Sequence, residues 1–193
     1  MKEEEKIIIL RTIRHGEGDL IVHGLTRQGA KMSFFAKSAV QSRKRFGGGT
    51  LEPTHYVHIQ FQRSTREGGL HRLTEAQLIK TFDGLRENYE RIETALYFVA
   101  VVERLSHEGI IDFSPLFDLL GHSLEAAQKS RQLEILKLQF QTKLLSLQGV
   151  LPQIEGIETL LVSSVRDHEA LYASLPSKTS RIQVEKSLEK LLS

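Results

Sequence analysis

The segment from Lys37 to Pro53 combines four cations with three consecutive glycines, residue types that suit contact with a flexible polyanion. Arg43, Lys44 and Arg45 stand side by side, and adjacent charges of this kind are not buried without partners. They therefore stay in solvent, where they are available to the phosphates of a nucleic acid. The glycines at positions 47–49 leave the backbone free to follow such a ligand. The pattern predicts a mobile basic loop; the alternative is a surface loop whose charges serve only solubility.

Charge is distributed unevenly along the 193 residues. Residues 1–80 contain 14 Lys and Arg against 8 Asp and Glu, a net charge of +6, whereas residues 81–193 contain 12 against 16, a net charge of −4. Three of the acidic residues, Glu3 to Glu5, stand at the start of the chain, which we expect to be frayed. A basic first half joined to an acidic second half suggests a nucleic-acid-binding module attached to something else.

The elements that position the basic loop are predicted to be strands, because five segments have the alternating pattern of a half-buried strand. They are residues 7–13, 19–26, 30–37, 55–62 and 70–79. In the third segment Phe35 lies between Lys31 and Lys37 on the face opposite the apolar one. A ring in that position can stack a base of a single strand; alternatively, it covers a second small core. Five short strands of this spacing fit the OB-fold, a barrel that often holds single strands.

After Phe82 the apolar period becomes that of helices. The stripe of the first helix consists of Leu85, Tyr89, Ile92, Leu96, Val99 and Val102. Ser114 and Pro115 begin a second helix, residues 131–148 form a third, and a short amphipathic helix ends the chain. The sequence therefore predicts an α+β protein, with a five-stranded OB-fold barrel as a DNA-binding domain at residues 1–80 and an all-helical domain at residues 81–193.

Patterns for other kinds of chemistry are weak. The glycines at 16–18 and 47–49 lack the Lys and Ser or Thr of a phosphate-binding P-loop and the spacing of a dinucleotide site. Zero cysteines exclude disulfides and thiolate zinc sites, and His55 and His58 face opposite sides of one strand, a poor arrangement for one metal ion. We expect no catalysis, cofactor or metal. The enzymatic alternative is a hydrolase whose site is assembled from residues distant in sequence.

Composition also bounds the setting of the protein. A hydrophobic content of 40% supports a buried core. No apolar run is long enough to span a bilayer, and the charged residues after Met1 do not form a signal peptide. We expect a cytoplasmic protein with no membrane partner.

Several short motifs occur in an order that resembles the RecO family of bacterial recombination mediators. They are residues 15–19 (HGEGD), 25–31 (LTRQGAK), 51–53 (LEP), 73–76 (LTEA) and 97–105 (YFVAVVERL). The resemblance covers roughly residues 7–150. It implies an OB-fold that binds single- and double-stranded DNA, followed by a helical domain. The resemblance also implies that the protein anneals complementary strands and uses no nucleotide. It further implies that the protein acts with a RecR-like partner, and that together they help the recombinase replace single-stranded-DNA-binding protein on gapped DNA.

The sequence departs from this family in one region. Many RecO-like proteins carry a four-cysteine zinc motif after the third helix, whereas residues 149–156 (GVLPQIEG) contain no cysteine. Zinc is therefore excluded at that place. The region after residue 150 must be held by packing alone.

Residues and resemblance together predict a non-enzymatic DNA-binding mediator of the RecO type. Cations hold phosphates, while Phe35 or Phe46 stacks bases. The predicted DNA-binding residues are Lys31, Phe35, Lys37, Arg43, Lys44, Arg45 and Phe46, with Arg11, Arg14, Arg27 and Arg72 as extensions. The alternative is an interaction adaptor whose OB-like barrel binds protein and not DNA.

The resemblance further implies a groove in the helical half for the acidic, phenylalanine-ended tail of single-stranded-DNA-binding protein. Such a tail needs an apolar slot and nearby cations. The predicted partner-binding residues are Arg131, Lys137, Phe140, Lys143 and Leu144. The alternative is that the apolar stripes lie wholly in the core of the domain and the cations are solvated.

Overall fold

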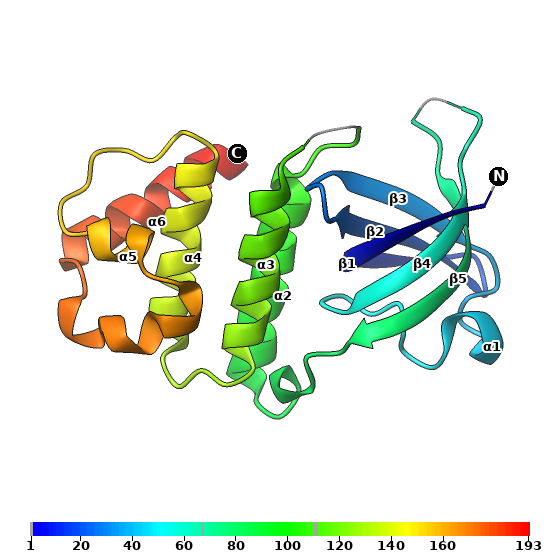
Figure 1. Ribbon diagram of the computed structural model, residues 1–193, viewed down its shortest axis with the longest axis horizontal. Helices are drawn as coiled ribbons and strands as arrows, with labels where there is room; N and C mark the ends of the chain where they lie inside the picture. Colours follow the sequence, from blue (N-terminus) through cyan, green and yellow to red (C-terminus); the bar gives the residue numbers. More distant parts are fainter. Residues whose placement is uncertain (1, 67, 110–111) are drawn as a thin grey trace. The chain divides into compact units, whose positions relative to one another are not determined.

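Five strands close into a barrel in the order β1, β2, β3, β5, β4 (Figure 1). The computed structural model of the protein describes residues 2–66, 68–109 and 112–193. The strands are β1 (Lys2–His15), β2 (Asp19–Thr26), β3 (Lys31–Ala36), β4 (Tyr56–Gln62) and β5 (His71–Lys80). Neighbours are antiparallel except β3 and β5, which run parallel where Phe34 pairs with His71. The five-stranded barrel predicted from the period-two pattern is confirmed, and it has the architecture of an OB-fold.

The barrel encloses an apolar core built from alternate strand residues. Ile7, Val22, Phe34 and Ile59 are all fully buried in it. Their strand neighbours face outward, because successive side chains of a strand point to opposite sides. The alternation thus separates one set of residues that fills the barrel from another that covers it.

The chain is part of the barrel from Lys2 on, so the expectation that Glu3 to Glu5 are frayed is wrong. Lys2 to Ile8 pair with β4, from Gln62 to Tyr56. The acidic side chains also have partners on or beside that strand, since Glu3 accepts from Arg63 Nε at 2.8 Å and Glu4 accepts from Gln60 Nε2 at 2.9 Å. The pairing holds the segment in place.

Two positions in the barrel require glycine. Gly29, in the β2–β3 turn, has φ of +82°, and a Cβ atom there would lie 2.2 Å from the carbonyl oxygen of Phe113. Gly24, within β2, has no room for a side chain either, because its Cβ would lie 2.4 Å from Ile7 Cδ1. Any other residue at these positions forces the backbone or its neighbours to move.

Helices follow the barrel, as predicted. The elements are the short helix α1 (Arg43–Phe46) between β3 and β4, then η1 (Asp83–Leu85), α2 (Tyr89–Leu105), α3 (Ser114–Ala127), α4 (Leu133–Leu147), α5 (Glu158–Val162), η2 (Val165–Ser174) and α6 (Lys178–Leu192). Helix α2, the first helix predicted after Phe82, begins later than its apolar stripe suggested. At its start Asn88 Oδ1 accepts from the amides of Glu90 and Arg91. Such a side-chain acceptor satisfies the orphan donors of a helix start.

The predicted stripe of α2 is partly wrong. Val99 and Val102 are buried, but Tyr89 is 77% exposed and Leu96 is 43% exposed. The buried face is centred instead on residues 95, 98 and 102. Leu85, from which the stripe was counted, lies in η1 and not in α2, so the phase of the count was shifted.

Contacts divide the chain into two compact units. The first contains residues 1–82 and 99–117, and the second contains residues 83–98 and 118–193. The grouping follows contacts and not chain order, because residues 99–117 join the barrel after the chain has left it. The sequence-based boundary after residue 80 stays a prediction.

In the second unit α4 is the central helix. It contacts α5, η2 and α6, and nine of its residues are buried on all sides of its axis, polar Gln139 and Thr142 among them. Phe140 is fully buried, with its ring centroid 4.3 Å from that of Phe98. A helix that is buried all round forms the core of its unit.

Candidate nucleic-acid interface

The outer surface of β1, β2 and β3 carries an apolar strip that includes an aromatic ring. The register pairs Ile13 with Ile21, Ile21 with Phe35, and Phe35 with Arg72 of β5. Ile13, Ile21 and Phe35 are each partly exposed. His15 packs edge-on against Phe35, with ring centroids 5.8 Å apart. The strip therefore presents a supported aromatic ring beside a cation, which is the arrangement used to stack bases of a single strand.

Cations lie at the end of β3 that is next to this strip. Lys37 directly follows β3 and is exposed, as is Arg14 near the end of β1. Arg45 Nη2 donates to the carbonyl oxygen of Lys37 at 2.9 Å. This bond brings α1, with exposed Arg43 and Lys44, to the same end of the barrel. Arg14, Lys37 and the three cations of α1 together form the basic end of the barrel.

Helix α1 replaces part of the predicted mobile loop. Ser42 Oγ accepts from the amide and the Nε of Arg45, which caps the helix. Phe46 is only 1% exposed and joins the barrel core with Leu51. The interpretation of Phe46 as a base-stacking ring is therefore wrong, because the ring is buried in the core and the Arg45 guanidinium lies over it, 5.0 Å from its centroid. That burial also explains why three adjacent cations occupy a fixed place on the surface.

Arg27 and Arg72, two of the arginines predicted as extensions, differ in position. Arg72 is exposed and lies next to Phe35 in the register. Arg27 is also exposed, but it stands in the β2–β3 turn, at the end of β3 opposite Lys37. The structure thus brings Arg72 to the apolar strip, whereas Arg27 is separated from the basic end by the length of a strand.

Other predicted cations contact the end of α2, which sequence reasoning missed. Lys31 Nζ donates to the carbonyl oxygen of Glu103 at 3.2 Å, and Arg11 lies 4.0 Å from the Glu103 carboxylate. Ser33 Oγ donates to Glu108 Oε1 at 2.5 Å and contacts His23 Nδ1 at 2.9 Å. Glu103 is about 70 residues from Lys31, and no local pattern signals such a contact.

His23 is neutral in this network. Burial lowers the pKa of His23 below its ordinary value of 6.5, and Lys31 and Arg11 act in the same direction while Glu103 and Glu108 oppose them. The neutral ring leaves the positive charge of the outer face to the arginines and lysines.

The predicted partner-binding residues of the second unit do not form an open groove around Phe140 and Leu144. Phe140 and Leu144 are fully buried in the core around α4. The Lys143 ammonium donates to the Leu161 carbonyl, and Lys137 Nζ lies 4.4 Å from the centroid of the Tyr97 ring. Only Arg131 is exposed among the five residues. The apolar residues are covered because α5, η2 and α6 pack on α4, so the prediction of an open slot at Phe140 and Leu144 is wrong.

Side chains of the second unit also hold its last elements together. Gln139 Nε2 donates to the carbonyls of Leu160, Ser163 and Ser164 at 3.2, 2.9 and 3.4 Å. His168 is buried, with Nδ1 2.8 Å from the Val165 carbonyl and Nε2 2.7 Å from Ser130 Oγ. These bonds fix α5 and η2 to the α4 region.

The described residues contain no group of three or more His, Cys, Asp and Glu side chains placed to hold a metal ion. His58 Nε2 lies 3.3 Å from Glu4 on the outer surface, whereas His55 is buried and contacts the Thr50 carbonyl. No helix in the described part of the chain combines the length and apolarity needed to cross a bilayer.

Comparison with known proteins gives one consistent result. The family model "Recombination protein O N terminal" matches residues 1–82. A DNA repair protein RecO from Rubrobacter xylanophilus is 33% identical over 150 residues, which cover 77% of this chain and 58% of that protein. One from Syntrophobacter fumaroxidans is 35% identical over the same shares, and one from Thermodesulfovibrio yellowstonii is 32% identical over 159 residues, 81% of this chain and 61% of that protein. The chain therefore spans about three fifths of the length of these relatives.

Proposed function

Because the chain is related to the RecO proteins and its residues 1–82 belong to the family of their N-terminal domain, we propose that it is a non-enzymatic DNA-binding protein of recombinational repair. It binds single and double strands, anneals complementary strands and assists recombinase loading on gapped DNA. Its partners are a RecR-like protein and single-stranded-DNA-binding protein, and it works in the cytoplasm.

One observation carries the proposal of DNA binding. Phe35 is partly exposed on the outer face of the barrel and lies between the basic end and Arg72. Phosphates bind the cations through charge, and bases stack on the ring. Annealing needs only that two polyanions are screened and held together, which such a surface provides without covalent chemistry.

The test is a titration of short labelled single-stranded DNA, followed by fluorescence anisotropy at several salt concentrations. If about four to six phosphates are neutralised, the logarithm of the affinity falls against the logarithm of salt with a slope of about −3 to −5. The charge reversal Arg43→Glu, Lys44→Glu, Arg45→Glu weakens binding to every sequence alike and makes the slope shallower. Phe35→Leu weakens binding to single strands by roughly fivefold or more, because one stacked base is lost, and leaves the slope unchanged.

A matched control comes from the second unit. Lys178, Lys186 and Lys190 are exposed on α6, and reversing all three changes the net charge by the same amount as the variant in α1. Binding close to wild type is expected for this control. Equal losses in both triple variants would mean that net charge alone drives binding. An affinity that neither the α1 variant nor Phe35→Leu changes would reject the assigned face and favour a protein-binding barrel.

A further inference from the structure

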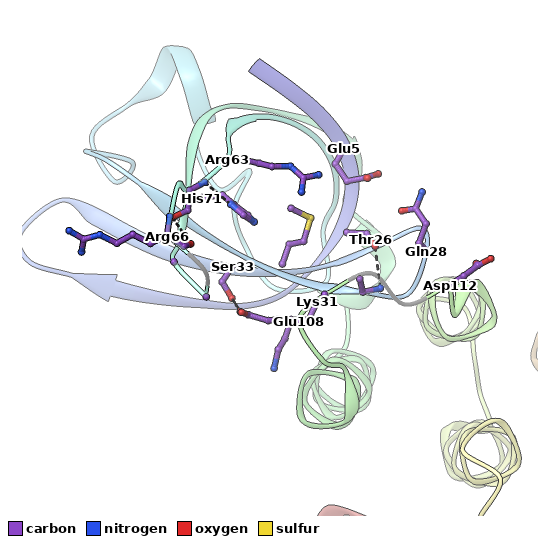
Figure 2. A pocket seen from close by; sticks show the side chains of 16 residues that line it. Glu5, Thr26, Gln28, Lys31, Ser33, Arg63, Arg66, His71, Glu108 and Asp112 are labelled. Atoms are coloured by element: carbon purple, nitrogen blue, oxygen red, sulfur yellow. Dashed lines mark hydrogen bonds between the residues drawn. The ribbon is translucent and has the colours of Figure 1, made fainter. Parts of the chain in front are cut away.

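The barrel is closed at one end by α1 and opens at the other into a cavity of about 680 Å³ (Figure 2). The cavity is lined by residues from four places in the chain. They include Glu5 of β1, Met32 at the start of β3, Ser64 and His71 between and within β4 and β5, and Glu108 with Asp112 after α2. All of these residues belong to the first unit. Mouths of β-barrels are common places for small ligands, and the volume lies in the usual range for such sites.

The charged side chains around the cavity balance one another. They are Lys31, Arg63 and Arg66 against Glu5, Glu108 and Asp112. Two of the cations are already engaged, since Lys31 binds the Glu103 carbonyl and Arg63 Nε binds both carboxylate oxygens of Glu3 at 2.8 Å. A site without excess positive charge does not favour a phosphate. It suits an uncharged ligand that has both donors and acceptors.

His71 gives the cavity a fixed donor. Its Nδ1 accepts from the amide of Ser64 at 3.0 Å, so the ring proton lies on Nε2. Its ring centroid lies 5.8 Å from that of Phe34 and 5.6 Å from that of Phe61, on top of the core. Burial lowers the pKa of His71 below 6.5, which keeps the ring neutral at pH 7.

Met32 gives the cavity an apolar surface. It is partly buried, packs against the barrel core and lines the cavity together with Ala30. A thioether side chain is polarisable and packs favourably against aromatic rings. The cavity therefore offers an apolar surface at Met32 and a donor at His71, which together suit a flat ligand with apolar faces and a hydrogen-bonding edge.

We propose that the barrel mouth takes one unpaired base of a DNA strand, with Met32 against its face and His71 Nε2 donating to its edge. The inference rests on the proposed function, in which the chain binds DNA, but it concerns a second site. The base lies inside the open end of the barrel, whereas Phe35 and Arg72 act on the outer surface. His71 and Arg72 are neighbours in β5, and successive strand residues face opposite sides. His71 therefore belongs to the cavity, whereas Arg72 belongs to the outer face.

The test uses Met32, one of the two methionines of the sequence. The full chain is labelled with methyl-¹³C-methionine and titrated with thymidine or 2′-deoxyadenosine, which contain a base but no phosphate. The Met32 methyl resonance is expected to shift through the ring current of the base and to saturate on the order of 1 mM. A Met32 signal that does not move, or that moves equally with 2-deoxyribose 5-phosphate, overturns the proposal.

A pair of variants locates the base. His71→Phe keeps an aromatic ring on Phe34 and Phe61 but removes the donor, so the nucleoside response weakens by about fivefold or more. Arg72→Ala is the matched control on the outer face and leaves the response unchanged. A response that is lost with Arg72→Ala and kept with His71→Phe assigns the base to the outer face and rejects the cavity. If His71→Phe does not fold, the wild-type titration with nucleosides and 2-deoxyribose 5-phosphate still decides whether the cavity binds a base.

Two further arms identify the source of the base. Hexathymidylate is expected to produce the same Met32 shift at a lower concentration than thymidine, because the outer face adds binding energy to the strand. A strand that leaves Met32 unmoved while thymidine shifts it overturns the assignment to DNA, and a shift produced by an uncharged dipeptide and not by nucleosides points to a peptide site. If the anisotropy titration shows no binding of single-stranded DNA while nucleosides still shift the Met32 resonance, the proposed function is rejected. The cavity would then remain a site for a nucleobase.

Discussion

At the scale of residues, the outer face of the barrel combines cations that are free to meet a ligand with cations that already have a carboxylate nearby. Glu103 is largely buried beside Arg11, with 19% of its side chain exposed, and its carbonyl oxygen accepts from Lys31. A negative group at this place repels a phosphate as well as attracting the arginine. Glu103 therefore limits how strongly this part of the sheet can attract DNA.

Glu103→Gln tests this effect, because it removes the charge and keeps the shape of the side chain and the carbonyl contact of Lys31. Affinity for short single-stranded DNA is expected to rise about two- to fivefold at low salt, and the gain is expected to shrink as salt is added. The measurement is the anisotropy titration. Glu189→Gln on exposed α6 changes the net charge equally and serves as the control. Unchanged or weaker binding by Glu103→Gln would show that the carboxylate does not oppose DNA.

At the scale of elements, α5 and η2 are fixed by side chains of α4. Gln139 is fully buried, and its amide donates to carbonyls at the end of α5 and just beyond it. The last carbonyls of a helix have no partners within the helix, so the amide acts as a cap supplied from another helix. The Lys143 ammonium adds a hydrogen bond to the Leu161 carbonyl. Its burial disfavours the charged form, which lowers the pKa of Lys143.

Gln139→Leu is expected to lower the free energy of unfolding of the second unit by about 1–3 kcal/mol, since buried carbonyls lose their donor. The loss is limited because Gln139 Oε1 is itself buried without a partner among the described residues. Hydrogen exchange provides the measurement. Amides of residues 158–174 lose protection, while those of the barrel strands keep it. Gln183→Leu, at an exposed site of α6, is the control, and equal protection in both variants would contradict the capping role.

At the scale of the whole molecule, two histidines link the stability of the barrel to pH. Burial lowers the pKa of both His23 and His71 from 6.5 in the folded state. Between the folded pKa and 6.5 the unfolded chain binds more protons than the folded one, so stability rises with pH in that window. The stabilisation that the two histidines contribute is therefore fully present above pH 6.5, and it is lost as the pH falls through the folded pKa.

Urea unfolding of the barrel at pH 7.5, 6.5 and 5.5 is therefore expected to give a midpoint that falls on acidification. The double variant His23→Gln, His71→Gln removes both titrating groups, and the midpoint is expected to change less between pH 7.5 and 5.5. An equally steep fall in the variant would assign the dependence to other groups. A midpoint that rises on acidification of the wild type would contradict the sign of both pKa shifts.

How far the sequence predicted this molecule depends on the distance over which each signal acts. The strands could be predicted because the alternation of apolar and polar residues is local. The same alternation was enough to assign Phe34 to the inner face of its strand and Phe35 to the outer face. Phe46 was misjudged because nothing in its neighbourhood shows that a loop residue enters the barrel. Glu103 and His71 were missed as site residues for the same reason, since their partners come from other elements. The short elements α5 and η2 gave no periodic signal, because they depend on contacts with α4.

The order of the strands around the barrel has a kinetic consequence. β1 is made first, yet it pairs with β4, and β3 pairs with β5, which ends at Lys80. Pairings between segments distant in sequence form slowly, since a long loop must be ordered before any contact is gained. On the ribosome, the barrel cannot close until residue 80 has left the exit tunnel. Until then the barrel that buries Ile7 and the other apolar residues of β1 is incomplete, and the nascent chain is most exposed to aggregation during this interval.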